Sequence, residues 1–475
     1  MSGARSTQKD IPIVVPIGGM DTTTWDHSLS AGTASLIDNM MIDKRRLYTR
    51  PGYERLTTSE GSIAATLMPF EFNNQSVLLS NSNGKVRNAL TGDLLFSHPG
   101  GGAKMSYSHI SNHLVFCCTV GSWYFDGTNV TPSNWVGGPA EFGGVVAHNE
   151  RLYYWENDSL DFYYAATGAI AGDLTLFPLS RLGNMRGSIA EMASWTVDAS
   201  HGANDVLVII TTAGDVAVYE GIDPGDSLDW RLTGRYKIAR PITSKKSTCK
   251  LGADLLVQTQ AGVLSMTSVF RGSELAMQET FSSKVDAEYL VDHYENWGIW
   301  QTYLDPKGKF LLLNSEDLQG NILQFVKCLG SGAWVRWSTI PAVDWCALGD
   351  DTFFISKGGH IYRYGVGNTD AGIDIVGHID MGGSDTKTAY SVSLAGGTFS
   401  ADGDFDLEIS ARGDQQLEGL SLLTSHDDGN DYRQVVMPVT SRGDTMQLTY
   451  RIYGRGTRVD FRTAEARGRV SRRRV

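Results

Sequence analysis

Cysteine is scarce in this chain of 475 residues, which has only five. Two of them are adjacent, the number is odd, and no pair has the Cys-x-x-Cys spacing of a zinc or redox site. A disulfide framework and a zinc site are therefore both unexpected, and synthesis in a reducing compartment is the simpler interpretation. The cysteines are Cys117, Cys118, Cys249, Cys328 and Cys346.

Long hydrophobic runs are also missing. The stretch "IPIVVPIGGM" at 11–20 is too short for a membrane span and is broken by proline, so no membrane insertion is expected. The sequence also has no P-loop and no His-Glu-x-x-His motif. No cofactor and no metal site is predicted.

The chain lacks an excess of positive charge, since its net charge is −12. Extensive binding to DNA phosphates would need a basic face, so the composition argues against it. The charge is unevenly distributed: residues 401–430 carry eight acidic side chains and one basic one, and residues 451–475 carry nine arginines and two acids. This asymmetry predicts docking between copies of the chain or with a partner.

Proline is infrequent, at 13 residues, whereas glycine is abundant, at 53. Abundant glycine without proline indicates tight turns between short strands. Seven hairpins with alternating apolar residues follow one another, with turns about 37 to 58 residues apart. This repeat predicts an all-β fold with a β-propeller of about seven blades, incomplete or irregular in places, and a β-sandwich or two stacked sandwiches is the alternative. The turns lie at Gly84, Gly121, Asn157–Asp158, Ala213–Gly214, Gly262, Gly320 and Gly358–Gly359.

The composition of the sequence changes around 366–380. This segment is rich in Gly, Asp and Thr and is predicted to be a linker or long connection. Longer alternating strands follow, such as "GDFDLEIS", and predict a C-terminal domain like a β-sandwich. We therefore expect an N-terminal arm and anchoring segment at 1–57 and a propeller at 58–366. A C-terminal β-rich domain with an arginine-rich tail is expected at 367–475.

Two motifs suggest chemistry, but neither is complete. "GDSL" at 225–228 has the signature of a lipase and esterase family, yet its serine, Ser227, has an Asp-x-x-His only upstream, at 198–201. "DGDFDLE" resembles a calcium loop, but Leu407 occupies the position that needs glycine. A turn and a strand with an acidic face are the simpler interpretations, and no catalytic residue is predicted.

Two basic clusters are candidates for assembly contacts. The first surrounds the Arg-Pro-Gly corner of "NMMIDKRRLYTRPGYERL" at 39–56, and the second ends the chain as "RGRVSRRRV". For the second, a solvated and disordered tail is the plainest prediction, and docking on an acidic surface of a neighbour or contact with DNA are the alternatives. The candidate interface residues are Arg45, Arg46, Arg50, Arg467, Arg469, Arg472, Arg473 and Arg474.

Three segments within residues 35–375 together resemble the tail nozzle, or tail hub, proteins of short-tailed bacteriophages, of the packaged-DNA stabilisation type. The first runs from Asn39 to the Arg50-Pro51-Gly52 corner, and the second is the Asn-x-Arg-Leu-Tyr strand at 149–153. The third has Trp334, Gly359, Ile361, Tyr362 and Tyr364 ahead of Asp370 and Gly372.

The resemblance implies a structural protein of the virion tail, made in the host cytoplasm and without enzymatic activity. It implies a homohexameric ring below the portal-adaptor ring, in contact with a tail fibre or tailspike. The Arg-Pro-Gly stretch would then anchor structure or a neighbouring ring. Double-stranded DNA would pass through the ring without being read, and the ring would help to retain the packaged genome. The alternative is a carbohydrate-binding or carbohydrate-cleaving propeller, that is, a lectin or a glycosidase.

Overall fold

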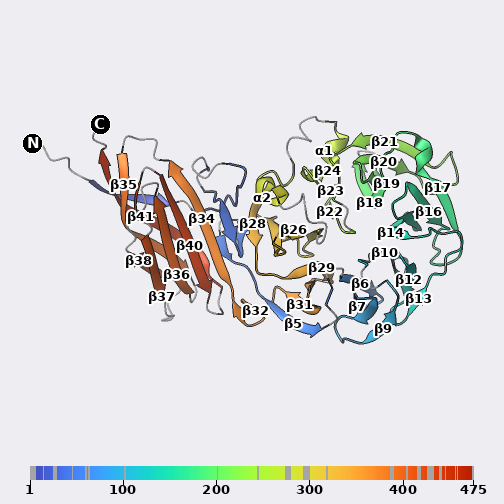
Figure 1. The fold of residues 1–475 in the computed structure, drawn as a ribbon, viewed down its shortest axis with the longest axis horizontal. Coiled ribbons are helices and arrows are strands. Elements are labelled where there is room, and N and C mark those ends of the chain that lie inside the picture. Colours follow the sequence, from blue (N-terminus) through green and yellow to red (C-terminus); the bar gives the residue numbers. More distant parts are fainter. Residues whose placement is uncertain are drawn as a thin grey trace, which may run out of the picture.

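The computed structural model describes residues 7–472 except 14, 25–28, 31, 45, 59–60, 63–64, 101–102, 200–201, 243–244, 273–279, 292–299, 317–318, 386–389, 403–404, 414–418, 425–432, 438–440, 444, 455 and 457. This part of the chain is built mainly from β-strands (Figure 1). Its helices are short: a 3-10 helix at Leu179–Leu182, α1 at Met266–Phe270 and α2 at Asp286–Val291. No helix in the described ranges is long and apolar enough to cross a membrane.

Four antiparallel sheets of four strands follow one another from residue 66 to residue 237 and form consecutive blades of a propeller (Figure 1). Hairpin turns join neighbouring strands within each sheet, as the glycine-rich turns predicted. The first blade contains β6 (Thr66–Phe72), β7 (Gln75–Ser82), β8 (Lys85–Asn88) and β9 (Leu94–Ser97); the second, β10 (Ser106–Ile110), β11 (His113–Cys118), β12 (Gly121–Phe125) and β13 (Val130–Pro132); the third, β14 (Phe142–His148), β15 (Arg151–Glu156), β16 (Asp161–Ala165) and β17 (Leu174–Pro178); the fourth, β18 (Ile189–Ala199), β19 (Gly202–Thr211), β20 (Asp215–Glu220) and β21 (Arg231–Lys237).

A smaller sheet and two more blades complete the ring. The smaller sheet has three strands: β22 (Thr248–Leu251), β23 (Asp254–Thr259) and β24 (Gly262–Ser265). The next blade contains β25 (Gln301–Leu304), β26 (Phe310–Glu316), β27 (Ile322–Cys328) and β28 (Ala333–Trp337). The last contains β29 (Ala342–Leu348), β30 (Asp351–Ser356) and β31 (His360–Tyr364), with β5 (Tyr53–Thr58) as its fourth strand.

The predicted β-propeller is thus confirmed, with six four-stranded blades. The count of about seven depends on whether the three-stranded sheet is a further blade, and it stays a prediction. Strand β5 corrects the expected boundary at 58. It pairs antiparallel with β31, with Tyr53 opposite Tyr364, so residues from Tyr53 onward belong to the propeller and close it.

The N-terminal segment is also not a free arm. Strand β2 (Leu36–Asp38) lies between β28 of the propeller and β34 (Val376–Asp385), and thereby extends one blade into the C-terminal region. The sheet continues from β34 through β40 (Thr445–Gly454) and β36 (Phe405–Gly413) to β37 (Gly419–Thr424).

A second sheet in this region combines both ends of the chain (Figure 1). Its order is β3 (Met40–Asp43), β4 (Arg46–Thr49), β41 (Asp460–Arg472), β35 (Tyr390–Asp402) and β38 (Arg433–Met437). Strand β1 (Thr7–Ile13) pairs with β41, and β39 (Ser441–Gly443) pairs with β35. A C-terminal β-rich region is therefore present, whereas its packing as a sandwich stays a prediction.

Two further expectations are wrong. The predicted linker at 366–380 contains the short strands β32 (Thr369–Asp370) and β33 (Ile373–Asp374) and the start of β34. The predicted free tail is ordered as strand up to Arg472, because β41 lies between β35 on one side and β1 and β4 on the other.

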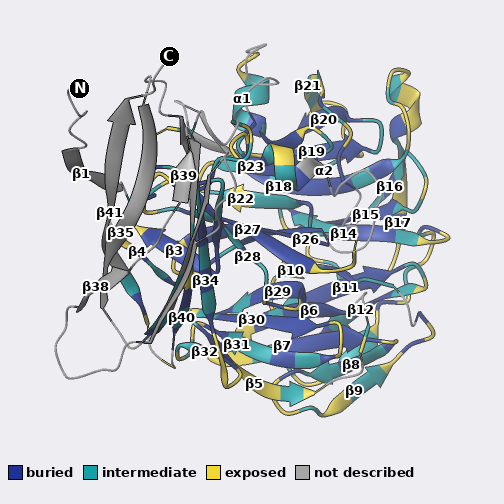
Figure 2. Ribbon diagram, turned by 60° about the vertical axis from the view of Figure 1, so that its left-hand side comes forward, coloured by how far each residue is buried: buried dark blue, intermediate teal, exposed yellow. Residues whose placement is uncertain are grey.

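One hydrophobic core extends across the propeller and the C-terminal region (Figure 2). The N-terminal segment contributes Ile37 and Leu47, the propeller contributes Trp337, and the C-terminal strands contribute Ile379 and Tyr450, all of them buried. Burying one large apolar side chain contributes about 1.5–3 kcal/mol. The shared core therefore couples the two regions, which the sequence suggested were separate.

Candidate functional site

The Arg-Pro-Gly corner forms a buried polar node inside the chain. The guanidinium of Arg50 has no exposed surface and binds both carboxylate oxygens of Asp370, at 2.8 and 2.5 Å. It also donates to Asn39 Oδ1 at 3.2 Å, to the Pro51 carbonyl at 3.0 Å and to Thr339 Oγ1 at 2.6 Å. Planar bidentate pairing of this kind suits arginine.

Glycine is required at the same corner. A Cβ on Gly52 would overlap the backbone of Thr369, which follows the last blade. The backbone N–H of Gly52 donates to the Gly367 carbonyl at 3.0 Å, and the Gly52 carbonyl accepts from the Gly365 N–H at 2.9 Å. The corner therefore anchors structure within this chain, which is one of its two predicted roles, and the buried guanidinium of Arg50 is not available to a neighbouring ring.

The other candidate interface residues are not gathered into one site. Arg46 is exposed on β4. Arg467, Arg469 and Arg472 lie at backbone positions of β41 opposite β35. Arg45, Arg473 and Arg474 lie outside the described residues.

Part of the predicted charge complementarity is satisfied within the chain. Glu408, from the acidic stretch, accepts from Arg451 on the neighbouring strand β40 at 3.3 Å, and it also accepts from the hydroxyl of Tyr453 at 3.0 Å. Exposed pairs of this kind contribute only about 0–1 kcal/mol. Glu408 and Arg451 nevertheless pair with each other within the chain, so a partner would have to compete with this contact.

The "GDSL" stretch lies in the loop between β20 and β21, where Ser227 is exposed. The loop is ordered by its own carboxylates: Asp229 accepts from the N–H groups of Ile222 and Asp223, and Asp226 accepts from that of Leu228. The bond from Leu228 to Asp226 is an Asx turn, and Asp229 closes the loop on residues 222 and 223, so the motif forms a surface turn. His201, the upstream histidine, lies outside the described residues.

Sequence reasoning missed a buried charge cluster at the propeller axis. Asp344 on β29 is fully buried and accepts from Lys246 Nζ at 2.6 Å and from the Leu67 N–H at 2.7 Å. Lys104 Nζ lies 3.6 Å from the other oxygen of Asp344, and burial lowers the pKa of this lysine. A lone aspartate in the apolar strand "AVDWCAL" was the available signal.

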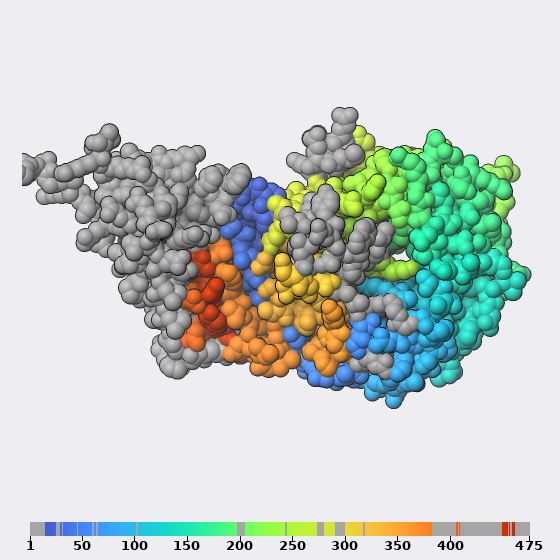
Figure 3. All heavy atoms as spheres, viewed as in Figure 1, coloured from blue at the N-terminus to red at the C-terminus, as the bar shows by residue number. Residues whose placement is uncertain are grey.

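A second buried carboxylate faces the same segment from another blade. Glu191 on β18 accepts hydrogen bonds from the hydroxyls of Ser247 and Thr248, and burial raises its pKa. The side chain of Lys245 reaches from this segment to the carbonyl of Gly143 on β14. Residues 245–248 therefore cross-link blades on several sides of the axis. The space-filling view shows an opening within the propeller (Figure 3).

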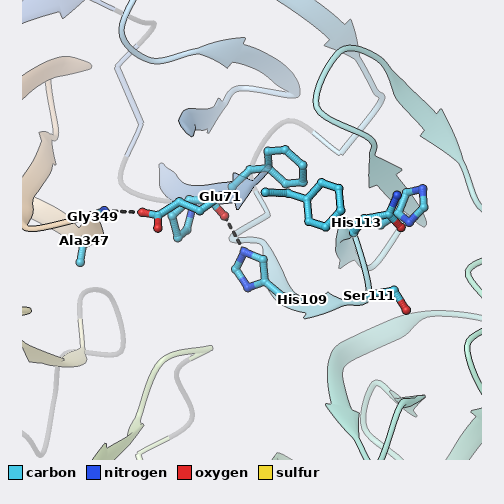
Figure 4. Close-up of a pocket in the computed structure, with 10 residues that line it drawn as sticks. Glu71, His109, Ser111, His113, Ala347 and Gly349 are labelled. Atoms are coloured by element: carbon cyan, nitrogen blue, oxygen red, sulfur yellow. Dashed lines mark hydrogen bonds between the residues drawn. The ribbon is translucent and has the colours of Figure 1, made fainter. Parts of the chain in front are cut away.

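A small pocket of about 280 Å³ opens at the turns between first and second strands, and Glu71, His109 and His113 are among the residues that line it (Figure 4). His109 Nε2 donates to the Pro69 carbonyl at 2.7 Å, and Glu71 accepts from the Gly349 N–H. His113 lies on the far side of the pocket, with its ring 5.5 Å from that of Tyr124. Glu71 and His109 thus join adjacent blades, and within the described ranges no group of three or more ligating residues could hold a metal ion.

No protein-family model matches the chain, and no curated protein matches it significantly. Among solved structures, the β-propeller domain of Cps50 (Swd1) from Myceliophteria thermophila aligns at 13% identity and a TM-score of 0.39, over 66% of this chain and 99% of that one. An exo-β-1,3-galactanase from Phanerochaete chrysosporium aligns at 9% identity and a TM-score of 0.24, over 74% of this chain and 99% of that one. A glycoside hydrolase family 43 arabinoxylan arabinofuranohydrolase from Bacillus subtilis aligns at 10% identity and a TM-score of 0.26, over 97% of this chain and 99% of that one. At these values function has to be argued from the residues of this chain.

Proposed function

We propose that this chain is a structural subunit of the tail of a short-tailed phage, forming the nozzle or hub ring below the portal adaptor. Six copies would surround a channel through which the genome leaves, and the ring would help to retain packaged DNA. A tail fibre or tailspike would attach to it, and the assembled protein would reside in the virion tail.

The convergence of the motif residues carries this proposal. Asn39, Arg50 and Asp370 come from segments of the resemblance that lie as much as 331 residues apart, yet they bind one another in a single node. That node joins the N-terminal segment, the last blade and the start of the C-terminal sheets. Motifs that serve one structural joint are expected in a load-carrying subunit whose regions must stay fixed relative to one another.

The engagement of the axial carboxylates favours a structural over a glycosidase function. A glycosidase needs two carboxyl groups that face the scissile bond from opposite sides. Asp344 is buried beneath two lysines, and Glu191 is held by two hydroxyls. Both groups instead cross-link blades, so we propose no enzymatic activity.

The finer architecture belongs to the same proposal. We infer that β22–β24 form a seventh, three-stranded blade, because β22 lies between the first strands of the blades on either side. We also infer that the two C-terminal sheets pack as a sandwich, since strands of both contribute to one core. The sandwich would then present the edge that meets neighbouring copies.

Light scattering on the purified chain, alone and mixed with the adaptor ring of the same phage, tests the proposal. The expected mass is six times the 51.8 kDa of the subunit, in at least one of the two samples. Duplex DNA should bind weakly at physiological salt, because a subunit with net charge −12 gains little from counterion release. Monomer in both samples, or tight and steeply salt-dependent DNA binding, would contradict the proposal.

A further inference from the structure

Two cavities open on the same face of the propeller. The larger, of about 690 Å³, is lined by the turns after β15 and β19 and by the segments that enter β14, β18 and β22. The smaller, of about 420 Å³, is lined by the turn after β11 and by the segment between β13 and β14. Turns after second strands and connections between blades lie at the same end of the antiparallel strands. The pocket of Figure 4 lies at the opposite end.

The two cavities lie on either side of β14, in the third blade. Phe142 lines the smaller cavity and Gly143 lines the larger one. Both volumes are in the range of small-molecule sites in proteins. Because both cavities open at the same end of the blades, an elongated ligand would have to cross the end of the third blade to reach both.

The smaller cavity has an aromatic wall that is fixed in place. The half-buried indole of Trp135 donates from Nε1 to the hydroxyl of Tyr154 at 3.1 Å, and the two rings pack edge to face at 5.7 Å. Phe142 packs against the same tyrosine, with ring centroids 5.3 Å apart. The exposed amide of Asn134 provides a hydrogen-bonding group beside these rings. An aromatic wall with a polar group beside it suits the mixed apolar and hydroxyl faces of a sugar ring.

The larger cavity is cationic in a chain that is strongly acidic. Arg240 and Lys245 line it together with Asp158, so its charged residues sum to +1 whereas the chain carries −12. Arg240 is exposed and makes no ion pair with a described residue. Ser188, Thr212 and the side chain of Asn157 add neutral hydrogen-bonding groups.

We propose that the two cavities form one site for an acidic oligosaccharide. A sugar ring packs on Trp135 and Phe142 in the smaller cavity, and a carboxylated ring in the larger cavity binds Arg240 through its planar fork. Lys245 is held to the Gly143 carbonyl and burial lowers its pKa, so the exposed Arg240 provides the main positive charge at this cavity. This binding activity is separate from the proposed ring assembly and does not depend on it.

Calorimetric titration of the full chain with trigalacturonate tests the site, with maltotriose as a neutral probe of similar size and acetate as a bare carboxylate. Trigalacturonate should bind at least tenfold more tightly than either control probe. Raising the ionic strength from 0.05 to 0.5 M should weaken it several-fold, because Coulomb attraction at an exposed site is screened. Equal binding of acetate would mean that only an adventitious anion is held, and no binding of trigalacturonate would overturn the proposal.

Two substitutions separate the contacts. Arg240→Gln should weaken trigalacturonate binding about tenfold and leave folding unchanged, since the side chain is exposed. Arg235→Gln, which removes an exposed charge on β21 away from both cavities, should change binding less than twofold. Asn134→Gly, which tolerates the positive φ of 47° at this position, reports on the smaller cavity and should weaken binding several-fold without changing the salt dependence. Equal losses in the Arg240 and Arg235 variants would show that binding is unspecific and would overturn the site.

Discussion

The Arg50–Asp370 pair should be among the most costly polar contacts to break. In Asp370→Asn the guanidinium of Arg50 stays buried, with no exposed surface, but loses its counter-charge. Removing one partner of a buried ion pair costs about 3–5 kcal/mol, because the other charge is left uncompensated in a site shielded from water. Replacing both partners, as in Arg50→Met with Asp370→Leu, should cost less than Asp370→Asn alone, since no buried charge remains.

Urea denaturation followed by tryptophan fluorescence measures these changes, and Trp337, whose ring lies 6.0 Å from Arg50, reports on the node. Asp351→Asn is the matched control: its pair with Arg363 is also short, at 2.8 Å, but both side chains are 40% exposed. Such exposed pairs contribute about 0–1 kcal/mol. If the two Asp→Asn variants lost the same stability, the reasoning about burial at the node would be refuted.

Three further predictions concern other parts of the fold. Gly144→Ala should destabilise the chain by about 1–3 kcal/mol, because its Cβ would overlap the indole of Trp155. Gly358→Ala has room for the added methyl group and should cost less than about 1 kcal/mol. Comparing the melting temperatures of the two variants with that of the parent tests this difference. Burial lowers the pKa of His148 to about 4, so the neutral ring stabilises the fold above pH 6.5 and this contribution is lost as pH falls towards 4. His148→Gln should therefore make the free energy of unfolding less dependent on pH between 4 and 6.5. An unchanged pH profile would show that His148 is not the source of this dependence. Deleting 467–475 removes half of a central strand and should unfold the C-terminal sheets, whereas deleting 473–475 should not; protease digestion that spared both variants equally would contradict the placement of β41.

Much of the fold could be predicted from the sequence because its hairpins are local. The turn at Gly358–Gly359 joins β30 and β31 as expected, since alternating apolar residues and a glycine turn specify such pairing over a few residues. Pairing between distant segments leaves no such local pattern. Strand β5 joins β31 more than 300 residues later, and β2 inserts between β28 and β34, so an apparent N-terminal arm proved to be part of both regions.

The polar sites also depend on contacts between distant segments, which the local sequence does not predict. The charge of Arg50 makes it a candidate interface residue, but only its position opposite Asp370 shows that it is internal. Asp344 and Lys246 are 98 residues apart, and neither belongs to a motif, so the axial cluster emerges only from the closure of the propeller. The many arginines of "AEARGRVSR" predict a free tail, and the alternation of its apolar residues is weak. The segment is a strand because it pairs with β35 and β1, and neither pairing can be read from the local sequence.

End-on electron microscopy of the purified chain, alone and with its adaptor ring, tests the central claim most directly. The account predicts closed rings with six-fold symmetry and an open centre wide enough for duplex DNA, with propellers repeated around it. Single particles of one subunit's size in both samples would contradict it.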